Sequence, residues 1–397
     1  MKARLPRLAG GAFGYAPVGW SRCVAAVALL IGAGCLGAPH RLWGQDDLRP
    51  TYQVFVANES SDVVSRVAFT PGEGARVVSE TPVGIVPTEL EAPHGLAVSP
   101  DGRYWYVSLA HGMPFGRVWK WDVEADTLAG WTQLGMFPAT MDLSPDGRFL
   151  FAVNFNLHGD RVPSSVSVVY TSDMIEIARL TTCIMPHGSR VNQAGDRHFS
   201  ACMHSEQVVA IDTRSFRVVG RFRVAPGQEG PLPLDDLGWP RRHTPPDSDH
   251  VAVCAPTWAE PGRGAWARFV YVTCNRGGTI LEIDAADWRL SRRIEVSDGP
   301  YNLATTPEGR LLVVTLKNGQ AIAILDLSRG EIVARVSTTR PITHGAVVSP
   351  DGRYAFVTNE AIGGQRGTVD VISLERFELA ASVEVGLQPG GIAFLLE

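Results

Sequence analysis

One short pattern recurs along this chain, and no other feature of the sequence constrains the fold as strongly. Each copy is an apolar stretch, a turn of the Ser-Pro-Asp-Gly type and a second stretch of alternating apolar residues, which is the signature of a β-hairpin. The copies cover residues 93–110, 138–155, 186–204, 300–317 and 343–360, and a degenerate copy begins near residue 249. A repeat of this length predicts a propeller or a similar array.

Two further strand-like stretches follow each hairpin, so one unit holds four strands. Four short strands per unit are typical of one blade of a β-propeller. The copies give six complete blades, and the seventh is split between residues 52–60 with the two stretches that follow them and residues 389–397 at the other end. The sequence therefore predicts an all-β, seven-bladed propeller over residues 46–397, closed by pairing of its N- and C-terminal strands so that no edge is free.

The first 45 residues differ in composition from the rest. They contain five cations and no acid, and an apolar run covers residues 23–38. This combination predicts a signal peptide, cleaved between Ala38 and Gln45, and export to the periplasm or the outside of the cell. An uncleaved N-terminal anchor is one alternative, and Cys35 raises a lipoprotein as another. We expect no membrane span in the mature chain, because no later segment is long and apolar enough.

Charge and cysteine content exclude several classes of protein. The net charge is −5, and the chain after residue 45 is more acidic still, which argues against a nucleic-acid partner. No cysteine motif for covalent haem and no phosphate-binding glycine loop is present, so we expect neither haem nor a nucleotide. Four cysteines follow the leader, and they are expected to be free and buried, although an exported chain could pair them. They are Cys183, Cys202, Cys254 and Cys274.

One segment departs from the repeat. Residues 226–249 contain six prolines and precede the degenerate fifth blade, so we expect a surface insertion there rather than a linker between domains. Residues 255–267 are expected to form a turn that is longer than its counterparts. Long loops on a rigid scaffold often carry function, and a neutral insertion is the alternative.

The repeat resembles that of the YVTN/YncE-type propeller family. The shared pattern is P-x-G followed by A-V-S-P-D-G-R, an alternating strand ending in V-[TA]-N, and a third strand of the type V-x-V-I-D, and it extends over residues 52–397. The resemblance implies an exported seven-bladed propeller. It implies little about chemistry, because related rings serve as binding platforms, lactonases or domains of metalloenzymes, and a fold does not fix a function.

Histidines are concentrated at one position of the repeat. In a propeller, the residues just before each innermost strand surround one mouth of the central channel, and several converging imidazoles suit copper or zinc. The expected metal ligands are His94, His187 and His344, with His250 or His204 in addition. This arrangement resembles nitrous-oxide-reductase-like propellers, but the paired histidines and the cupredoxin domain of those enzymes are missing. The alternative is that each imidazole bonds the backbone of the neighbouring blade. In blades 1 to 7 the position is occupied by Gly390, His94, Ala139, His187, His250, Tyr301 and His344.

The loops that leave the second strands reach the same mouth. They are expected to bring Glu59, Lys317 and Glu360 beside Tyr301 as ligand-contacting groups. Inside the channel, small or apolar side chains such as Val253 are expected, apart from Asp142 and Arg190 on neighbouring blades. Opposite charges at one level of a narrow channel should pair, because an isolated buried charge is costly. Capture of a carboxylate on the substrate by Arg190 is the alternative.

Three functions fit these features. The first is an exported, monomeric platform that binds a small molecule or a protein at the mouth, with a histidine-bound copper or zinc ion. The second is a lactonase-type hydrolase that uses Glu59 or Glu360 with a histidine as acid and base. The third is a metal-free interaction scaffold in the cell envelope, with residues 226–249 as the contact. Whether the chain is an enzyme stays open.

Overall fold

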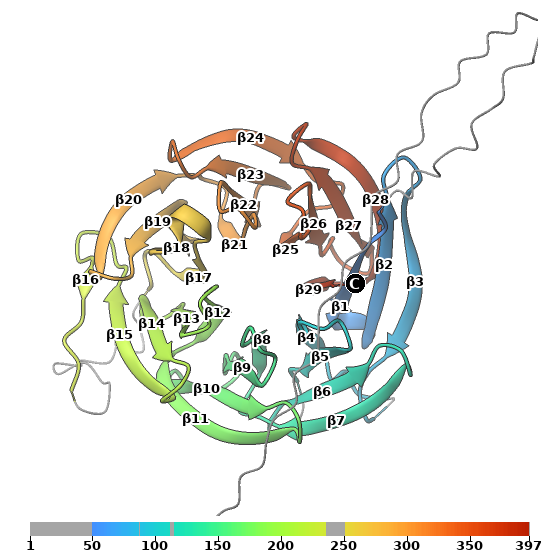
Figure 1. Cartoon of the computed structure of the whole chain (residues 1–397), viewed down its shortest axis with the longest axis horizontal. Helices are drawn as coiled ribbons and strands as arrows, with labels where there is room; N and C mark the ends of the chain where they lie inside the picture. Colours follow the sequence, from blue (N-terminus) through green and yellow to red (C-terminus); the bar gives the residue numbers. More distant parts are fainter. Residues whose placement is uncertain (1–49, 87, 112–114, 236–250, 397) are drawn as a thin grey trace, which may run out of the picture. The chain divides into compact units, whose positions relative to one another are not determined.

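The repeated hairpins form seven antiparallel sheets arranged around a central axis (Figure 1). The computed structural model describes residues 50–396 except 87, 112–114 and 236–250. Within this described part the structure is built from strands and two single 3₁₀ turns, η1 (Glu59–Ser61) and η2 (Gly264–Trp266). The prediction of an all-β, seven-bladed propeller is therefore confirmed. The predicted signal peptide and the centre of the 226–249 insertion lie outside the described residues.

Each blade begins with its innermost strand and runs outward. Blade 1 consists of β29 (Pro389–Leu395), β1 (Tyr52–Asn58), β2 (Val63–Thr70) and β3 (Gly74–Pro82). Blade 2 contains β4 (Pro93–Val98), β5 (Tyr104–Leu109), β6 (Arg117–Asp122) and β7 (Thr127–Gln133). Blade 3 contains β8 (Pro138–Leu143), β9 (Phe149–Asn154), β10 (Pro163–Tyr170) and β11 (Ile175–Ile184).

Blade 4 carries a short fifth strand from the start of the insertion. It contains β12 (Pro186–Val191), β13 (Arg197–Cys202), β14 (Gln207–Asp212), β15 (Arg217–Arg223) and β16 (Gly230–Pro231). Blade 5 contains β17 (Pro256–Pro261), β18 (Phe269–Cys274), β19 (Thr279–Asp284) and β20 (Arg289–Glu295). Blade 6 contains β21 (Pro300–Thr305), β22 (Leu311–Leu316), β23 (Ala321–Asp326) and β24 (Glu331–Ser337). Blade 7 contains β25 (Thr343–Val348), β26 (Tyr354–Asn359), β27 (Arg366–Ser373) and β28 (Glu378–Leu387).

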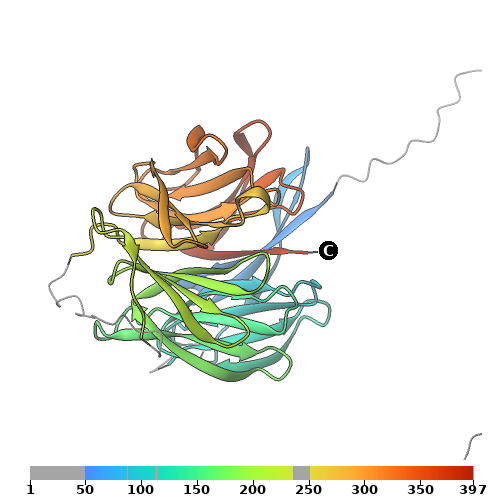
Figure 2. The ribbon, with the colours of Figure 1, turned by 60° about the vertical axis from the view of Figure 1, so that its left-hand side comes forward.

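The ring closes through its two terminal strands. β29 pairs antiparallel with β1, with Gln53 opposite Leu395 and Phe55 opposite Ala393. In the turned view of Figure 2, the red terminal strand runs beside the blue strands of blade 1. The predicted pairing of the N- and C-terminal strands is thus confirmed.

The hydrophobic core lies between neighbouring blades. Among the described residues, seven apolar clusters each join the faces of two adjacent sheets around the ring. Strands in the middle of a sheet face a neighbour on both sides, which explains why β22 is buried at every position and apolar at all but Thr315 rather than strictly alternating. Every blade depends on two neighbours, so the ring is stabilised as a whole.

The third residue of the innermost strand is glycine in four blades, and there is a steric reason for it. A Cβ atom on Gly95 would lie 2.2 Å from the carbonyl oxygen of Ala139, and one on Gly391 would lie 2.0 Å from that of His94. Gly188 and Gly345 meet neighbouring carbonyls in the same way. In these four blades the innermost strands therefore approach a neighbouring strand so closely that glycine is required.

Blade 5 does not follow the predicted alignment. Its innermost strand is β17, so the stretch expected to be a long turn is the strand itself followed by η2. Thr257 takes the position predicted for His250, which lies outside the described residues. Val253 is half exposed rather than in the channel, where Glu260 takes its place. The turn after β17 is longer than its counterparts, and this obscured the register.

The expectation of free cysteines is wrong. Cys183 is bonded to Cys202, and Cys254 to Cys274. The first disulfide joins the outer strand of blade 3 to the second strand of blade 4, and the other ties the segment before β17 to β18. Sequence spacing cannot reveal this, because the partners meet only after the blades have formed. Among the described residues, no helix has the length and apolar character needed to cross a membrane.

Candidate functional site

Three backbone positions of each blade build one mouth of the channel. The first is the residue before each innermost strand, which has a left-handed conformation in every blade. Its carbonyl accepts a hydrogen bond from the residue that leaves the second strand, as Gln388 does from Glu59 and Phe137 from Phe155. This residue, which leaves the second strand, is the second position. The third position is the second residue of the innermost strand. The left-handed positions are Ala92, Phe137, Met185, Ala255, Gly299, Ile342 and Gln388.

The mouth histidines, which we define as His94, His187 and His344, converge as predicted. The ring centroid of His94 lies 6.1 Å from that of His187 and 5.9 Å from that of His344. All three are buried, with 2–7% of their surface exposed. Imidazoles from blades 2, 4 and 7 therefore lie next to one another at the mouth.

Two of these imidazoles also bond the neighbouring blade, which was the predicted alternative. His94 Nδ1 lies 3.1 Å from the carbonyl oxygen of Ala139, and His187 Nδ1 lies 3.0 Å from that of Thr257. A carbonyl can only accept, so Nδ1 carries the proton in both rings and Nε2 is left for another partner. The structural and the functional interpretation are therefore compatible, since they use different nitrogens.

Tyr301 joins two of the mouth histidines. Its hydroxyl donates to His187 Nε2 at 3.2 Å, and its ring centroid lies 4.7 Å from that of His344. Burial, with a smaller contribution from neighbouring His94, lowers the pKa of His187 to about 3, and burial with the charge of Lys317 lowers the pKa of His344 well below its usual value. Both imidazoles are therefore neutral near pH 7.

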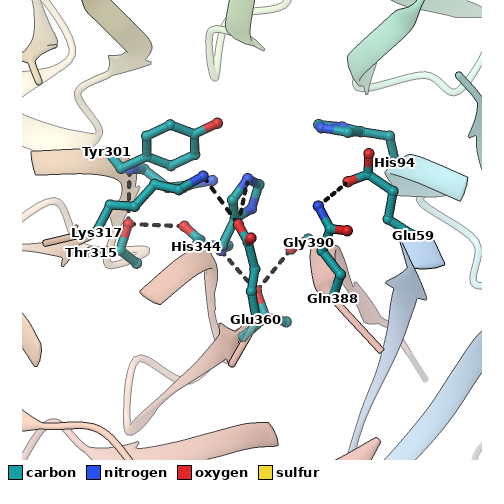
Figure 3. A network of polar contacts seen from close by, with 12 residues as sticks. Glu59, His94, Tyr301, Thr315, Lys317, His344, Glu360, Gln388 and Gly390 are labelled. Atoms are coloured by element: carbon teal, nitrogen blue, oxygen red, sulfur yellow. Dashed lines mark hydrogen bonds and ion pairs between the residues drawn. The ribbon is translucent and has the colours of Figure 1, made fainter. Parts of the chain in front are cut away.

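A half-buried ion pair lies beside these rings (Figure 3). Lys317 Nζ lies 3.1 Å from Glu360 Oε1 and 4.2 Å from the ring centroid of Tyr301. Burial alone would lower the pKa of Lys317, but Tyr301 and Glu360 outweigh it and raise the pKa. His344 Nε2 lies 3.7 Å from the same Glu360 oxygen. The ammonium group thus has partners on two sides.

Glu59 faces this group across the mouth (Figure 3). His111 Nε2 lies 3.4 Å from Glu59 Oε1, and the amide of Gln388 donates to Oε2 at 3.5 Å. Burial would raise the pKa of Glu59, but the hydrogen bond with His111 and electrostatic interactions with His94, His111 and Lys317 lower it. The carboxylate is therefore ionised at neutral pH. We call Glu59, Tyr301, Lys317, His344, Glu360 and Gln388 the polar half of the mouth.

The other side of the mouth is aromatic, and its central residue, Phe137, was not predicted from the sequence. Phe137 packs edge-on against His94 at 5.5 Å, His111 at 4.9 Å and His158 at 5.5 Å between ring centroids. Phe155 lies 4.8 Å from His187. With Ala110 and Ala139, the two phenylalanines form a small apolar cluster separate from the clusters between blades. We call His111, Phe137, Phe155 and His158 the aromatic half.

Two of the three mouth histidines already have neighbours at Nε2, the nitrogen that would bind a metal ion. His187 Nε2 accepts from Tyr301, and His344 Nε2 faces the Lys317–Glu360 pair. Throughout the described ranges, no three His, Cys, Asp or Glu side chains are grouped to hold a metal ion. His204 is not at the strand-exit register, where Met203 bonds the carbonyl of Met185 instead. These described residues do not form a ready copper or zinc site, and we derive no step through one.

A small cavity lies directly beneath the mouth histidines. Its volume is about 30 Å³, enough for about two water molecules. Its walls include His94, His344, Asn302, Arg190 and Trp258. A ligand larger than a few atoms cannot enter the channel here, so it would have to bind on the mouth itself.

Arg190 does not pair with Asp142 as predicted. Its nearest acid is Glu260, with 3.7 Å between Nε and Oε2, and its guanidinium lies 4.5 Å from the ring centroid of Trp258. Asp142 instead accepts the backbone N–H of Val191 at 2.8 Å. Burial raises the pKa of Asp142, and the charge of Arg190 offsets only part of that effect. Glu260 was missed because the register of blade 5 was misread.

Double-mutant cycles should distinguish the two partners. Removing the charge in Arg190→Met should lower the free energy of unfolding by about 2–3 kcal/mol, because it leaves buried Glu260 without a cation. Combined with Glu260→Gln, the loss should fall short of the sum by about 1 kcal/mol, whereas Asp142→Asn should combine almost additively. Urea unfolding of the single and double variants measures both couplings. A larger coupling with Asp142 than with Glu260 would contradict this assignment.

Comparison with known proteins supports the propeller fold. Residues 306–394 match the family model described as "Cytochrome D1 heme domain". Antigen Lp49 of Leptospira interrogans serogroup Icterohaemorrhagiae serovar copenhageni (strain Fiocruz L1-130) is 35% identical over 84 residues. That match covers 18% of this chain and 18% of the antigen. Neither match extends far enough to assign the chain to a family, and neither description is that of the predicted YVTN/YncE type.

Three solved structures share the fold over most of this chain. Periplasmic gluconolactonase PpgL of Pseudomonas aeruginosa has a TM-score of 0.64 at 19% identity, covering 87% of this chain and 99% of its own. Hydrazine synthase of Kuenenia stuttgartiensis has a TM-score of 0.61 at 19% identity, with coverage of 81% and 92%. Dihydro-heme d1 dehydrogenase NirN, in complex with DHE, has a TM-score of 0.55 at 16% identity, with coverage of 86% and 74%. At these identities the likeness concerns the fold alone.

Proposed function

We propose that this propeller binds a small polyhydroxylated molecule of the sugar-lactone class at its mouth. The observation that carries the proposal is the pair of carboxylates, Glu59 and Glu360, on blades 1 and 7 around the mouth histidines. Carboxylates accept strong hydrogen bonds from hydroxyl groups, and neutral imidazoles offer further acceptors. A ligand with several hydroxyl groups can meet both kinds of partner.

Charge argues against a simple anion as the ligand. The only cation of the polar half, Lys317, is already paired with Glu360 and lies over the Tyr301 ring. Two carboxylates and one ammonium give the polar half a formal charge of −1 while its imidazole is neutral. A neutral ligand therefore fits better, and the fold is one that a gluconolactonase also has.

Neither a metal ion nor a macrocycle is needed for this proposal. The match to a cytochrome d1 family model suggests a haem-like ring as another ligand. Such a ring is far larger than the cavity of about 30 Å³ beneath the histidines. It would have to lie across the outer face of the mouth, and the Nε2 atom of His187 is already bonded to Tyr301. Copper or zinc stays a prediction that elemental analysis of the purified protein can check.

Binding of a stable lactone analogue tests the proposal. D-glucono-1,5-lactam should bind in isothermal titration calorimetry, and Glu59→Gln or Glu360→Gln should weaken binding about tenfold or more, because each removes a charged acceptor. Glu384→Gln is the matched control, because Glu384 lies on outer strand β28 and pairs with Arg340. Circular dichroism checks that the variants are folded. Absence of lactam binding, or equal affinities for all variants, would overturn the proposal.

Lactone hydrolysis is a second candidate, favoured by two Glu/His pairs at the mouth. Glu59 lies 3.4 Å from His111, and Glu360 lies 3.7 Å from His344. A carboxylate beside the bound lactone could take a proton from water as the water oxygen bonds the carbonyl carbon. The ring C–O bond then breaks, and its oxygen receives a proton to give the hydroxy acid. A pH-stat assay with D-glucono-1,5-lactone, corrected for spontaneous hydrolysis, decides between binding alone and turnover.

Export to the periplasm is part of the proposal. Two disulfides support an oxidising compartment, since such bonds rarely persist in the cytosol. The basic and apolar N-terminal segment predicts the same destination. The gluconolactonase that shares the fold is described as periplasmic.

A further inference from the structure

The mouth is chemically divided, and the division runs across the ring. The polar half comes from blades 1, 6 and 7, whereas the aromatic half comes from the loops of blades 2 and 3. His94 and His187 lie between them, since both contact phenylalanines and one bonds Tyr301. A ligand on the mouth histidines would therefore meet charged groups on one side and rings on the other.

Apolar side chains extend the aromatic half outward. Met136 precedes Phe137, and Leu157 follows Asn156, whose N–H donates to the carbonyl of Met136. A Cβ atom on Gly159 would lie 2.8 Å from Met136 Cε, so the methionine methyl group lies against the loop after β9. Met136 and Leu157 are 37% and 42% exposed. Together they form a short apolar shelf beside the mouth, which we define by these two residues.

We propose that the ligand is amphipathic, with its hydroxylated head on the polar half and an alkyl or aryl substituent on the aromatic half and the shelf. This rests on the proposed function, because the head fixes where the substituent begins. Scattered apolar residues on a surface need no explanation, but here they adjoin the aromatic half, whose His111 is a third exposed and whose His158 is exposed. Methionine is well suited to cover substituents of varied shape, because its side chain is flexible.

The position of the alkyl or aryl substituent follows from the surfaces that surround the mouth histidines. The cavity beneath the histidines takes about two water molecules, so a long substituent cannot point down the channel. An apolar group placed on the polar half would remove water from the Lys317–Glu360 ion pair, which is unfavourable. The aromatic half contacts His94 and His187 directly and the shelf continues it outward, so the substituent is assigned to that side.

A series of N-alkyl derivatives of D-glucono-1,5-lactam tests the inference. The N-hexyl compound should bind about tenfold or more tightly than the N-methyl compound, because each buried methylene contributes favourably. In the double variant Met136→Ser, Leu157→Ser, the ratio of the two affinities should fall towards one. It should be retained in Ile177→Ser, the matched control, which removes an equally exposed apolar side chain from outer strand β11.

The outcomes separate the two proposals. If the lactam binds but affinity does not depend on the alkyl chain, the amphipathic ligand is ruled out and the proposed function stands. If the gain persists in the double variant, the substituent lies elsewhere and the shelf is wrongly assigned. If no member of the series binds, the proposed function fails, and this inference fails with it.

Discussion

Removal of residues 389–397 should abolish the folded monomer. The deletion removes β29, the innermost strand of blade 1, and exposes the row of backbone groups on β1 that pairs with it. It also removes Ile392 and Leu395, which are buried in the clusters on either side of blade 1. The loss should exceed the whole free energy of unfolding, about 5–15 kcal/mol for a typical protein. Size-exclusion chromatography and thermal melting should show aggregation and no cooperative transition.

Relocating the strand is the decisive control. β29 ends beside the start of β1, so residues 389–397 can be joined to residue 51 through an Asn-Gly turn. This rearranged chain should regain a cooperative melt, because closure depends on the strand and not on its place in the sequence. Gly391→Ala should destabilise through the contact with the carbonyl of His94, whereas Gly364→Ala, in open space, should not. A truncated protein that melts like the full chain would refute closure by β29.

Acid should destabilise the fold at pH values well above those at which ordinary carboxylates titrate. Burial lowers the pKa of both His187 and His198 from 6.5 to about 3. Between these values the unfolded chain binds protons that the folded chain cannot, so the free energy of unfolding falls as the pH falls. The slope should reach about 1.4 kcal/mol per pH unit for each histidine. Urea unfolding at several pH values from 7 to 4 measures it.

His198→Phe isolates one of these contributions. His198 stacks on Phe151 at 5.1 Å between ring centroids, and neither of its ring nitrogens has a hydrogen-bond partner. A phenyl ring should therefore be tolerated or stabilising at pH 7, since an unsatisfied buried polar group is lost. The difference between the variant and the original protein should grow as the pH falls below 6.5. A constant difference would show that His198 does not resist protonation in the folded state.

The repeat made the architecture predictable, because each hairpin carries its own local signals. An Asp-Gly turn and two alternating strands are encoded within about 20 residues, and the number of copies then fixes the number of blades. The split blade was also predictable, since an unpaired innermost strand at one end complements three strands at the other. These inferences need no knowledge of side-chain contacts.

The mouth was predictable only where the copies have equal length. His94, His187, Tyr301 and His344 were found because their copies align without gaps. Blade 5 has a longer turn after its innermost strand, so Thr257 and Glu260 were missed and Arg190 was given the wrong partner. Pro256, at nearly the usual distance from its second strand, is the signal that would have corrected the register.

Phe137, at the centre of the aromatic half, was missed for a different reason. Phe137 occupies the left-handed position before a proline, where the other blades carry unrelated residues such as Ala92 and Gln388. Nothing in the pattern marks this position as facing the mouth, because its direction depends on the backbone turn rather than on strand alternation. The disulfides escaped prediction similarly, since Cys183 and Cys202 belong to different blades.

Histidine NMR tests most directly the central claim that the mouth is the ligand-binding site. With ¹³C-labelled histidine, addition of D-glucono-1,5-lactam should shift the resonances of His94, His187 and His344, assigned by single substitutions. The resonance of His198, buried between blades, should stay in place and serves as the internal reference. Shifts confined to the mouth histidines are the predicted result. Unchanged mouth resonances at saturating lactam would contradict the claim.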